Sequence, residues 1–139
     1  MPAQPFDYAV VRWVPDLDRG EWLNVGVLMY CAVADHIGCR VEFDTVRATA
    51  LCPAADHSAP AQHLSALAAV CRGDSDAGPV ARFPTGERFH WLVHPRSAAL
   101  QVSAVHAGLS EDLPTTLDQL FERLVRIRPT PPSPLSTGA

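Results

Sequence analysis

Residues 21–33, EWLNVGVLMYCAV, decide the fold of this chain. The stretch is apolar at nearly every position and rich in β-branched residues, which favour strands. A strand with one solvated face alternates apolar and polar residues, whereas a nearly continuous apolar run predicts burial on both faces. We therefore expect residues 21–33 to form a central strand of a sheet.

Strand patterns lie on both sides of this segment. Residues 6–14, FDYAVVRWV, stop at Pro15, and residues 37–43 return after a hairpin turn at 34–36. Farther along, residues 88–93 and 100–105 predict two more strands, joined by a turn at Pro95. The sequence thus predicts a mainly antiparallel sheet of about five strands.

Two segments carry the apolar spacing of a helix that packs by one face. Residues 58–73 end at Gly73, a residue that favours helix C-termini, and residues 113–127 begin after two acids and end among arginines. The stripes are Leu64, Leu67, Ala68 and Cys71 in the first helix, and Leu113, Leu117, Leu120, Phe121 and Leu124 in the second. We predict an α+β fold, ordered strand–strand–strand–helix–strand–strand–helix, with both helices packed on one face of the sheet.

Length and composition predict a single domain. The chain has 139 residues, of which 47% are apolar and 19% charged, as in ordinary globular proteins. We place the domain at residues 1–128 and expect the proline-rich tail 129–139, PTPPSPLSTGA, to be disordered. The longest apolar run, residues 25–34, is too short to cross a bilayer, and no signal peptide is visible. We expect a cytoplasmic protein with no membrane segment.

Charge and cysteine usage exclude several kinds of site. All eleven basic residues are arginine, so neither a Schiff-base lysine nor a phosphate-loop lysine exists. Four cysteines show no C-x-x-C pair, so we expect reduced thiols and no metal site. No recognised catalytic motif is present, so we expect no cofactor. The net charge of −4 argues against a strongly basic surface for nucleic-acid binding. Such binding would require a shared surface for several arginines: Arg12, Arg19, Arg88, Arg96 and Arg126.

Residues 94–109, HPRSAALQVSAVHAGL, place polar side chains in a mostly apolar stretch. Buried polar groups require partners, so this stretch is either a hydrogen-bonded turn or a small pocket for an anion. In a pocket, arginine and serine would clamp the anion, serine and glutamine would orient it, and histidine would form a polar wall. The candidate ligand-binding residues are Arg96, Ser97, Gln101, Ser103, His106 and His90. Strict alternation places His106 opposite Gln101 and Ser103 unless the strand ends or bends near Ala104.

Three other features have two interpretations each. Asn24 and Gly26 interrupt the central strand, which predicts either a β-bulge or the close approach of a ligand or another backbone at Gly26. His90 and His94 would lie about 13 Å apart on a strand and could not chelate one metal. On a helix they would share one face, but the glutamate of H-E-x-x-H is missing. Trp13 and Trp22 would be interface anchors if exposed.

Two motifs suggest a family. The pattern R-G-E-x-x-N-V-G-V at residues 19–27 and R-F-H-W-L-x-x-P-R-S at 88–97 are similar to the bacterial domain-of-unknown-function family 3037. The resemblance extends over residues 6–126 and implies no reaction, cofactor or catalytic residue. Relatives in some genomes appear beside a HipA-like kinase, which implies such a kinase as a protein partner.

We therefore expect a small accessory or binding protein that acts through a partner protein or a small anionic ligand. The alternative hypothesis is a hydrolase or transferase in which His106 acts as general base beside Arg96 and Ser97.

Overall fold

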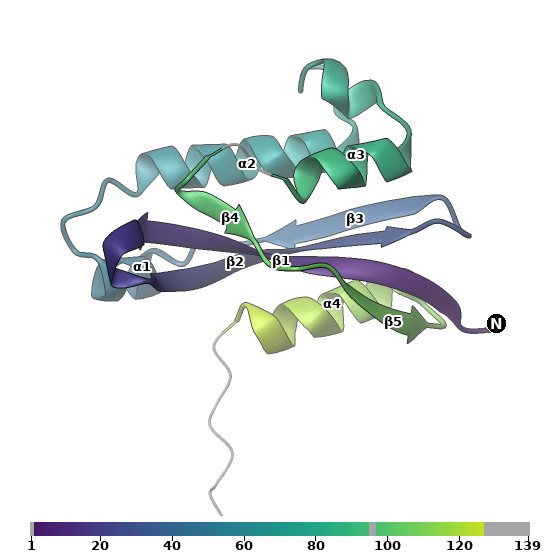
Figure 1. Ribbon diagram of the computed structural model, residues 1–139, viewed down its shortest axis with the longest axis horizontal. Coiled ribbons are helices and arrows are strands. Elements are labelled where there is room, and N and C mark those ends of the chain that lie inside the picture. The colour runs from purple at the N-terminus through teal and green to yellow at the C-terminus, as the bar shows by residue number, and fades with distance from the viewer. Residues whose placement is uncertain (1, 95–96, 127–139) are drawn as a thin grey trace, which may run out of the picture.

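The computed structural model describes residues 2–94 and 97–126 and contains a five-stranded antiparallel sheet with helices on both faces (Figure 1). The α+β class is confirmed. Arg96 and the whole tail 129–139 lie outside the described residues. The elements are β1 (Gln4–Asp16), the 3-10 turn η1 (Leu17–Arg19), β2 (Glu21–Cys31), β3 (His36–Val41), α1 (Thr45–Leu51), α2 (Ser58–Arg72), the 3-10 turn η2 (Pro79–Arg82), α3 (Thr85–Leu92), β4 (Leu100–Val102), β5 (His106–Ser110) and α4 (Leu113–Leu124).

The sheet has the order β3-β2-β1-β4, and β5 also pairs with β1. As its apolar run predicts, β2 is an inner strand, and Val25, Val27 and Met29 have no exposed surface. β1 is long enough to pair with β4 near one end and with β5 near the other. The edge beside β1 is therefore a broken strand made of two short pieces.

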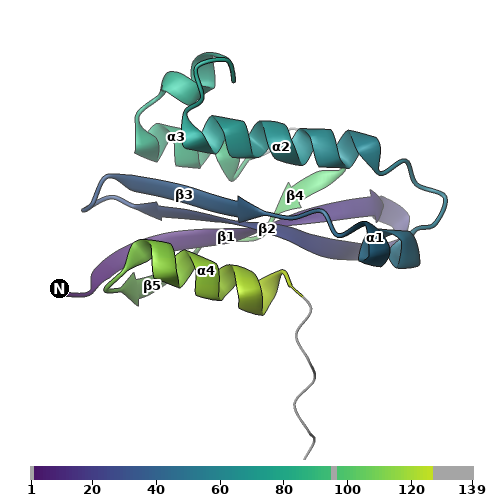
Figure 2. The same cartoon turned by 180° about the vertical axis from the view of Figure 1, so that it is seen from behind.

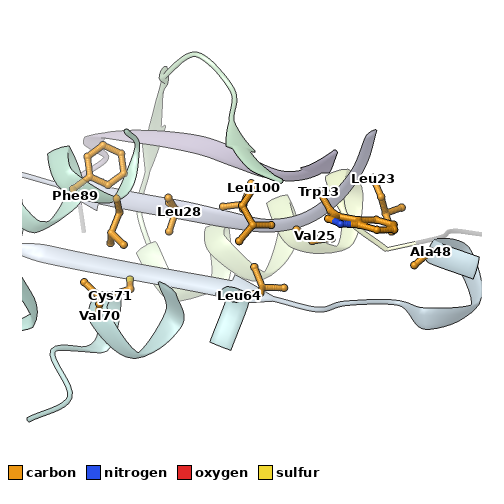
Figure 3. Packing of buried hydrophobic residues seen from close by; sticks show 12 residues of the cluster. Trp13, Leu23, Val25, Leu28, Ala48, Leu64, Val70, Cys71, Phe89 and Leu100 are labelled. Carbon is orange, nitrogen blue, oxygen red and sulfur yellow. The ribbon is translucent and has the colours of Figure 1, made fainter. Parts of the chain in front are cut away.

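The core consists of two clusters, one on each face of the sheet. Residues including Leu28, Leu64 and Phe89 fill the space between the sheet and helices α2 and α3 (Figure 3). The second cluster joins Val27 and Phe121, so α4 covers the opposite face (Figure 2). The prediction that both helices pack on one face is wrong in this respect. Because β2 is apolar on both faces, each face requires its own cover.

Residues 88–93 do not form the predicted strand, because helix α3 extends from Thr85 to Leu92. Phe89 and Leu92 are three positions apart and both are buried, which is helical spacing. The Phe89 ring stacks on Tyr30 of β2 with 5.4 Å between ring centroids. Arg88 donates hydrogen bonds to the carbonyl oxygens of Ala81 and Phe83, which fixes the preceding loop. The predicted strand at 100–105 contains only the short β4, and the fifth strand is β5, which begins just after the predicted segment.

Candidate functional site

In the turn before β4, polar side chains form hydrogen bonds with main-chain groups of the same turn. The Ser97 hydroxyl accepts a hydrogen bond from the Ala99 N–H at 3.1 Å, and the Gln101 amide donates to the Ala98 carbonyl at 3.4 Å. Leu100 and Gln101 pair with Trp13 and Arg12, so successive residues of β4 face opposite sides of the sheet. This arrangement agrees with the hydrogen-bonded turn. Arg96, the proposed anion clamp, lies outside the described residues.

Ser103 closes the break between β4 and β5. Its N–H donates to the Val10 carbonyl at 2.9 Å, and its buried hydroxyl accepts from the Val10 N–H at 2.9 Å. The same hydroxyl donates to the Ala104 carbonyl at 2.9 Å. Ser103 thus replaces both strand hydrogen bonds of Val10 where the ladder is interrupted. With its hydroxyl proton and one lone pair in use, Ser103 has a structural role in this fold.

The break also decides which way His106 faces. Gln101 pairs with Arg12, whereas His106 pairs with Tyr8, so the pairing shifts by one residue between β4 and β5. The shift puts His106 on the same face as Gln101, which strict alternation would not. The His106 ring lies 5.3 Å from the Tyr8 ring between centroids. Tyr8 and Arg12 are four residues apart on β1, about 13 Å, so His106 and Gln101 share a face without forming one site.

His90 lies on the exposed side of α3. Its ring is 4.7 Å from that of His94, and the His94 Nδ1 atom is 2.8 Å from the His90 carbonyl oxygen. The two rings are therefore neighbours at the C-terminal end of α3 and not the distant strand residues that alternation predicts. Within residues 2–94 and 97–126, no group of three or more histidine, cysteine or acidic side chains could hold a metal ion.

A row of polar residues crosses three strands on the α4 side of the sheet. Arg12 of β1 pairs with Asn24 of β2 on one side and with Gln101 of β4 on the other. The pairing of β1 with β2 shifts beside this row, because Val11 pairs with Gly26 while Arg12 pairs with Asn24. This shift places one extra residue, Val25, in β2. Directly paired residues bring their Cβ atoms to about 5 Å, so the three side chains are immediate neighbours.

Gly26 allows the backbone of β3 to lie close to β2. A Cβ atom added there would lie 2.9 Å from Val41 Cγ1 and 3.2 Å from the Arg40 carbonyl oxygen, so the missing side chain lets β3 approach β2. The register shift at Asn24 and the close approach of the β3 backbone to Gly26 both result from the packing of neighbouring strands.

Arg12 is the unusual member of the row. Its guanidinium lies over the Trp22 ring at 4.5 Å from the ring centroid, and its Nε atom is buried with no hydrogen-bond acceptor. Arg40, Arg47 and Arg88 are partly buried as well, and each donates to a carboxylate or a carbonyl oxygen. Among the described residues, Arg12 is the partly buried arginine that has neither a hydrogen bond nor an ion pair.

The neighbours of Arg12 add an exposed ring and further polar groups beside it. Trp22 is 49% exposed, whereas Trp13, on the opposite face, is only 3% exposed and belongs to the core. The Asn24 amide nitrogen donates to the Leu124 carbonyl at 3.0 Å, and its Oδ1 atom is buried without a partner. A buried donor on β1 and a buried acceptor on the paired position of β2 are therefore both unsatisfied. We call Arg12, Trp22, Asn24 and Gln101 the Arg12 site.

From the sequence, Arg12 was considered as one of several arginines that a nucleic-acid surface would require, so this site was missed. One signal was available, since Arg12 interrupts the apolar run of residues 9–14 at a strand position. Its partners could not be inferred, because they depend on the register of two neighbouring strands.

A family model for proteins of unknown function, DUF3037, matches residues 8–125. The chain belongs to this family. No curated protein and no solved structure matches it. The DUF3037 match spans both motifs that suggested the resemblance and nearly all of the described fold.

The first motif of this DUF3037 chain has a structural explanation at its start. Arg19 and Glu21 form an ion pair at 2.6 Å across the turn that joins β1 to β2, and Gly20 between them has a left-handed φ of 68°. Because Glu21 is engaged by Arg19, it does not neutralise Arg12. The ion pair is exposed and contributes little to stability.

The structure has a hollow on each face of the sheet, and only the smaller of the two includes a residue of the polar row. An apolar groove of about 420 Å³ between α2, α3 and β4 includes Ser97 among its lining residues, which are His63, Ala66, Leu67, Val70, Trp91, Leu92, Ser97 and Leu100. A smaller hollow of about 200 Å³ contains Asn24 beside charged groups that already have partners. There Arg126 binds Glu42 at 2.8 Å and Arg47 donates to the Val125 carbonyl at 2.7 Å.

Helices in the described parts of the chain are all too short or too polar to span a membrane.

Proposed function

We propose that this DUF3037 protein is a cytoplasmic binding protein that recognises an oxyanion at the Arg12 site. The anion is a carboxylate or phosphate group, carried by a partner protein or by a small ligand. The observation that carries the proposal is the partly buried Arg12 guanidinium, which lies over Trp22 without any hydrogen bond or ion pair among the described residues. No cofactor is part of this proposal.

Energetics supports a role for Arg12 outside the fold. A buried donor left without an acceptor costs about 1–3 kcal/mol, and the cost is greater for charged groups. The cation–π contact with Trp22 returns only about 0.5–1 kcal/mol at a partly exposed position. A carboxylate or phosphate would accept two parallel hydrogen bonds from the guanidinium, the arrangement for which arginine is best suited.

The flanking residues add selectivity for a group that also carries a hydroxyl or N–H. The exposed Gln101 side chain stands beside Arg12 on β4. On the other side, the unsatisfied Asn24 Oδ1 atom can only accept a hydrogen bond. The site therefore offers donors for an oxyanion next to one acceptor for an adjacent donor. Protein partners with exposed carboxylates, of which the HipA-like kinase is a concrete example to test, fit the same chemistry.

The enzyme hypothesis has less geometric support. Ser103 uses its hydroxyl on Val10 and Ala104, and Ser97 uses its hydroxyl on Ala99. The ring contact of His106 is with Tyr8. No hydrogen bond within the described residues joins His106 to either serine, so a serine activated by this histidine is not assembled.

An NMR titration of the arginine side chains tests the proposal. Sodium phosphate, sodium acetate and a short aspartate-rich peptide are added at constant ionic strength, and the Nε–H signals are followed. We expect the Arg12 signal, identified by its loss in Arg12→Met, to shift saturably with at least one probe. Because a charged hydrogen bond contributes about 1.5–3 kcal/mol, Arg12→Met should weaken binding about 10-fold or more, measured by shifts of the Trp22 indole signal.

Two other arginines serve as controls in the same spectra. Arg47 already donates to a carbonyl and should not respond, and the exposed Arg82 reports non-specific association. Saturation by phosphate or acetate indicates a small ligand, and saturation by the peptide alone indicates a protein partner. An Arg12 signal that shifts no more than that of Arg82 with every probe would refute the proposal.

A further inference from the structure

Cys39 and Cys71 face each other across the contact between β3 and α2. On β3, Gly38 and Arg40 approach α4, since Arg40 lies over the Phe121 ring at 4.2 Å. The alternation of a strand therefore turns Cys39 toward the other face, where α2 packs. Cys71 is 2% exposed in the core cluster on that face, and Cys39 packs against the same cluster. Figure 3 shows Cys71 on the side of α2 that faces the sheet.

The two thiols interact directly. The Cys71 S–H donates a hydrogen bond to the Cys39 sulfur, which lowers the pKa of Cys39, and the nearby positive charge of Arg72 lowers it further. The same hydrogen bond, together with burial and the negative charge on Cys39, raises the pKa of Cys71. Cys39 is also the more accessible thiol, because it is only partly buried. The pair thus contains a partly exposed thiol with a lowered pKa and a buried partner thiol.

We propose that Cys39 and Cys71 are a redox modification site, at which hydrogen peroxide converts the two thiols into a reversible disulfide between β3 and α2. The Cys39 thiolate attacks one peroxide oxygen, the O–O bond breaks, and Cys39 becomes a sulfenic acid while hydroxide leaves. Cys71 then attacks the Cys39 sulfur, the S–S bond forms, and the S–O bond breaks. The Cys71 proton and the proton that Cys39 released on ionisation convert the two hydroxide leaving groups to water. Two thiols are oxidised as one peroxide is reduced.

The direction of the second step follows from the first. While Cys39 is a thiolate, its charge and hydrogen bond keep Cys71 protonated. Once Cys39 is a neutral sulfenic acid, both influences disappear and Cys71 becomes the better nucleophile. The other two cysteines have different surroundings. Cys31 is fully buried in the cluster beneath α4 and contacts Gln4, whereas Cys52 lies against the cluster beneath α2.

Peptide mapping after peroxide treatment tests this proposal. Full-length protein is treated with a small excess of hydrogen peroxide, the remaining thiols are alkylated, and the protein is digested with trypsin. Fragments 20–40 and 48–72 each contain two cysteines, so a matched double variant, Cys31→Ser with Cys52→Ser, leaves only the proposed pair. We expect the two fragments to be linked in the wild type and in this variant, with the loss of two hydrogens, and to separate on reduction by dithiothreitol.

A second variant and a melting curve complete the experiment. Cys39→Ser should abolish the link, and circular dichroism checks that the variant is folded. Oxidised wild type should melt at a higher temperature than reduced wild type, since the link constrains the unfolded chain. If the double variant forms no link, or if Cys39 proceeds to sulfinic acid while Cys71 is alkylated, the proposal is wrong. That result would leave the Arg12 site unaffected.

Discussion

Phe121→Ala is expected to lower the free energy of unfolding by about 3–5 kcal/mol, the usual cost of removing a buried aromatic ring. Phe121 is 1% exposed at the centre of the cluster between α4 and the sheet. Arg40 and Arg126 lie over its ring at 4.2 Å and 5.2 Å from the centroid, so the substitution also removes two cation–π contacts. Urea denaturation, followed by circular dichroism, measures the loss.

Gln119→Ala provides the matched control on the same helix. Gln119 is exposed, so its replacement should change the free energy of unfolding by less than about 0.5 kcal/mol. A loss below about 1 kcal/mol for Phe121→Ala would contradict the conclusion that α4 seals the second face of the sheet.

Leu92→Ala is expected to lower the free energy of unfolding by about 2–5 kcal/mol, whereas His90→Ala should leave it within about 0.5 kcal/mol of the wild type. In α3, Leu92 is 1% exposed in the first core cluster, and His90 is on the solvent side. On a strand the two residues would share one face and one environment. The comparison therefore tests the helix directly.

The same urea denaturation measurements can also contradict the helical assignment of α3. Similar losses for Leu92→Ala and His90→Ala would mean that both side chains are buried together, as strand alternation requires. The far-ultraviolet spectra of both variants should retain the helical signal of the wild type, which shows that the comparison concerns folded proteins.

Local sequence patterns predicted the elements whose apolar residues form a simple pattern. β2 is a continuous apolar run, and the buried residues of α4 have regular helical spacing. The segment at α3 is short and mixes apolar with polar residues at almost every position. Its helical state depends on the contact of Phe89 with Tyr30 and on the burial of Leu92, which are tertiary interactions. Which face each helix covers is likewise decided by packing between distant segments.

The candidate site was less predictable than the fold, because it depends on strand register. Ser97 and Gln101 form their hydrogen bonds with the main chain of their own turn. The Arg12 site instead combines β1, β2 and β4, and its row is aligned by the extra residue in β2. A register shift of one residue reverses every side chain of a strand, as the position of His106 illustrates.

We propose that Arg12 binds a ligand and does not stabilise the fold. The most direct measurement of this central claim compares the free energies of unfolding of Arg12→Met and Arg47→Met in urea. Methionine keeps an aliphatic contact with Trp22 and removes the unpaired buried donor, so Arg12→Met should match the wild type within about 0.5 kcal/mol or exceed it. Arg47→Met, which loses the 2.7 Å hydrogen bond to Val125, should lose about 1.5–3 kcal/mol. An equal loss for Arg12→Met would show that this guanidinium stabilises the fold and would contradict the account.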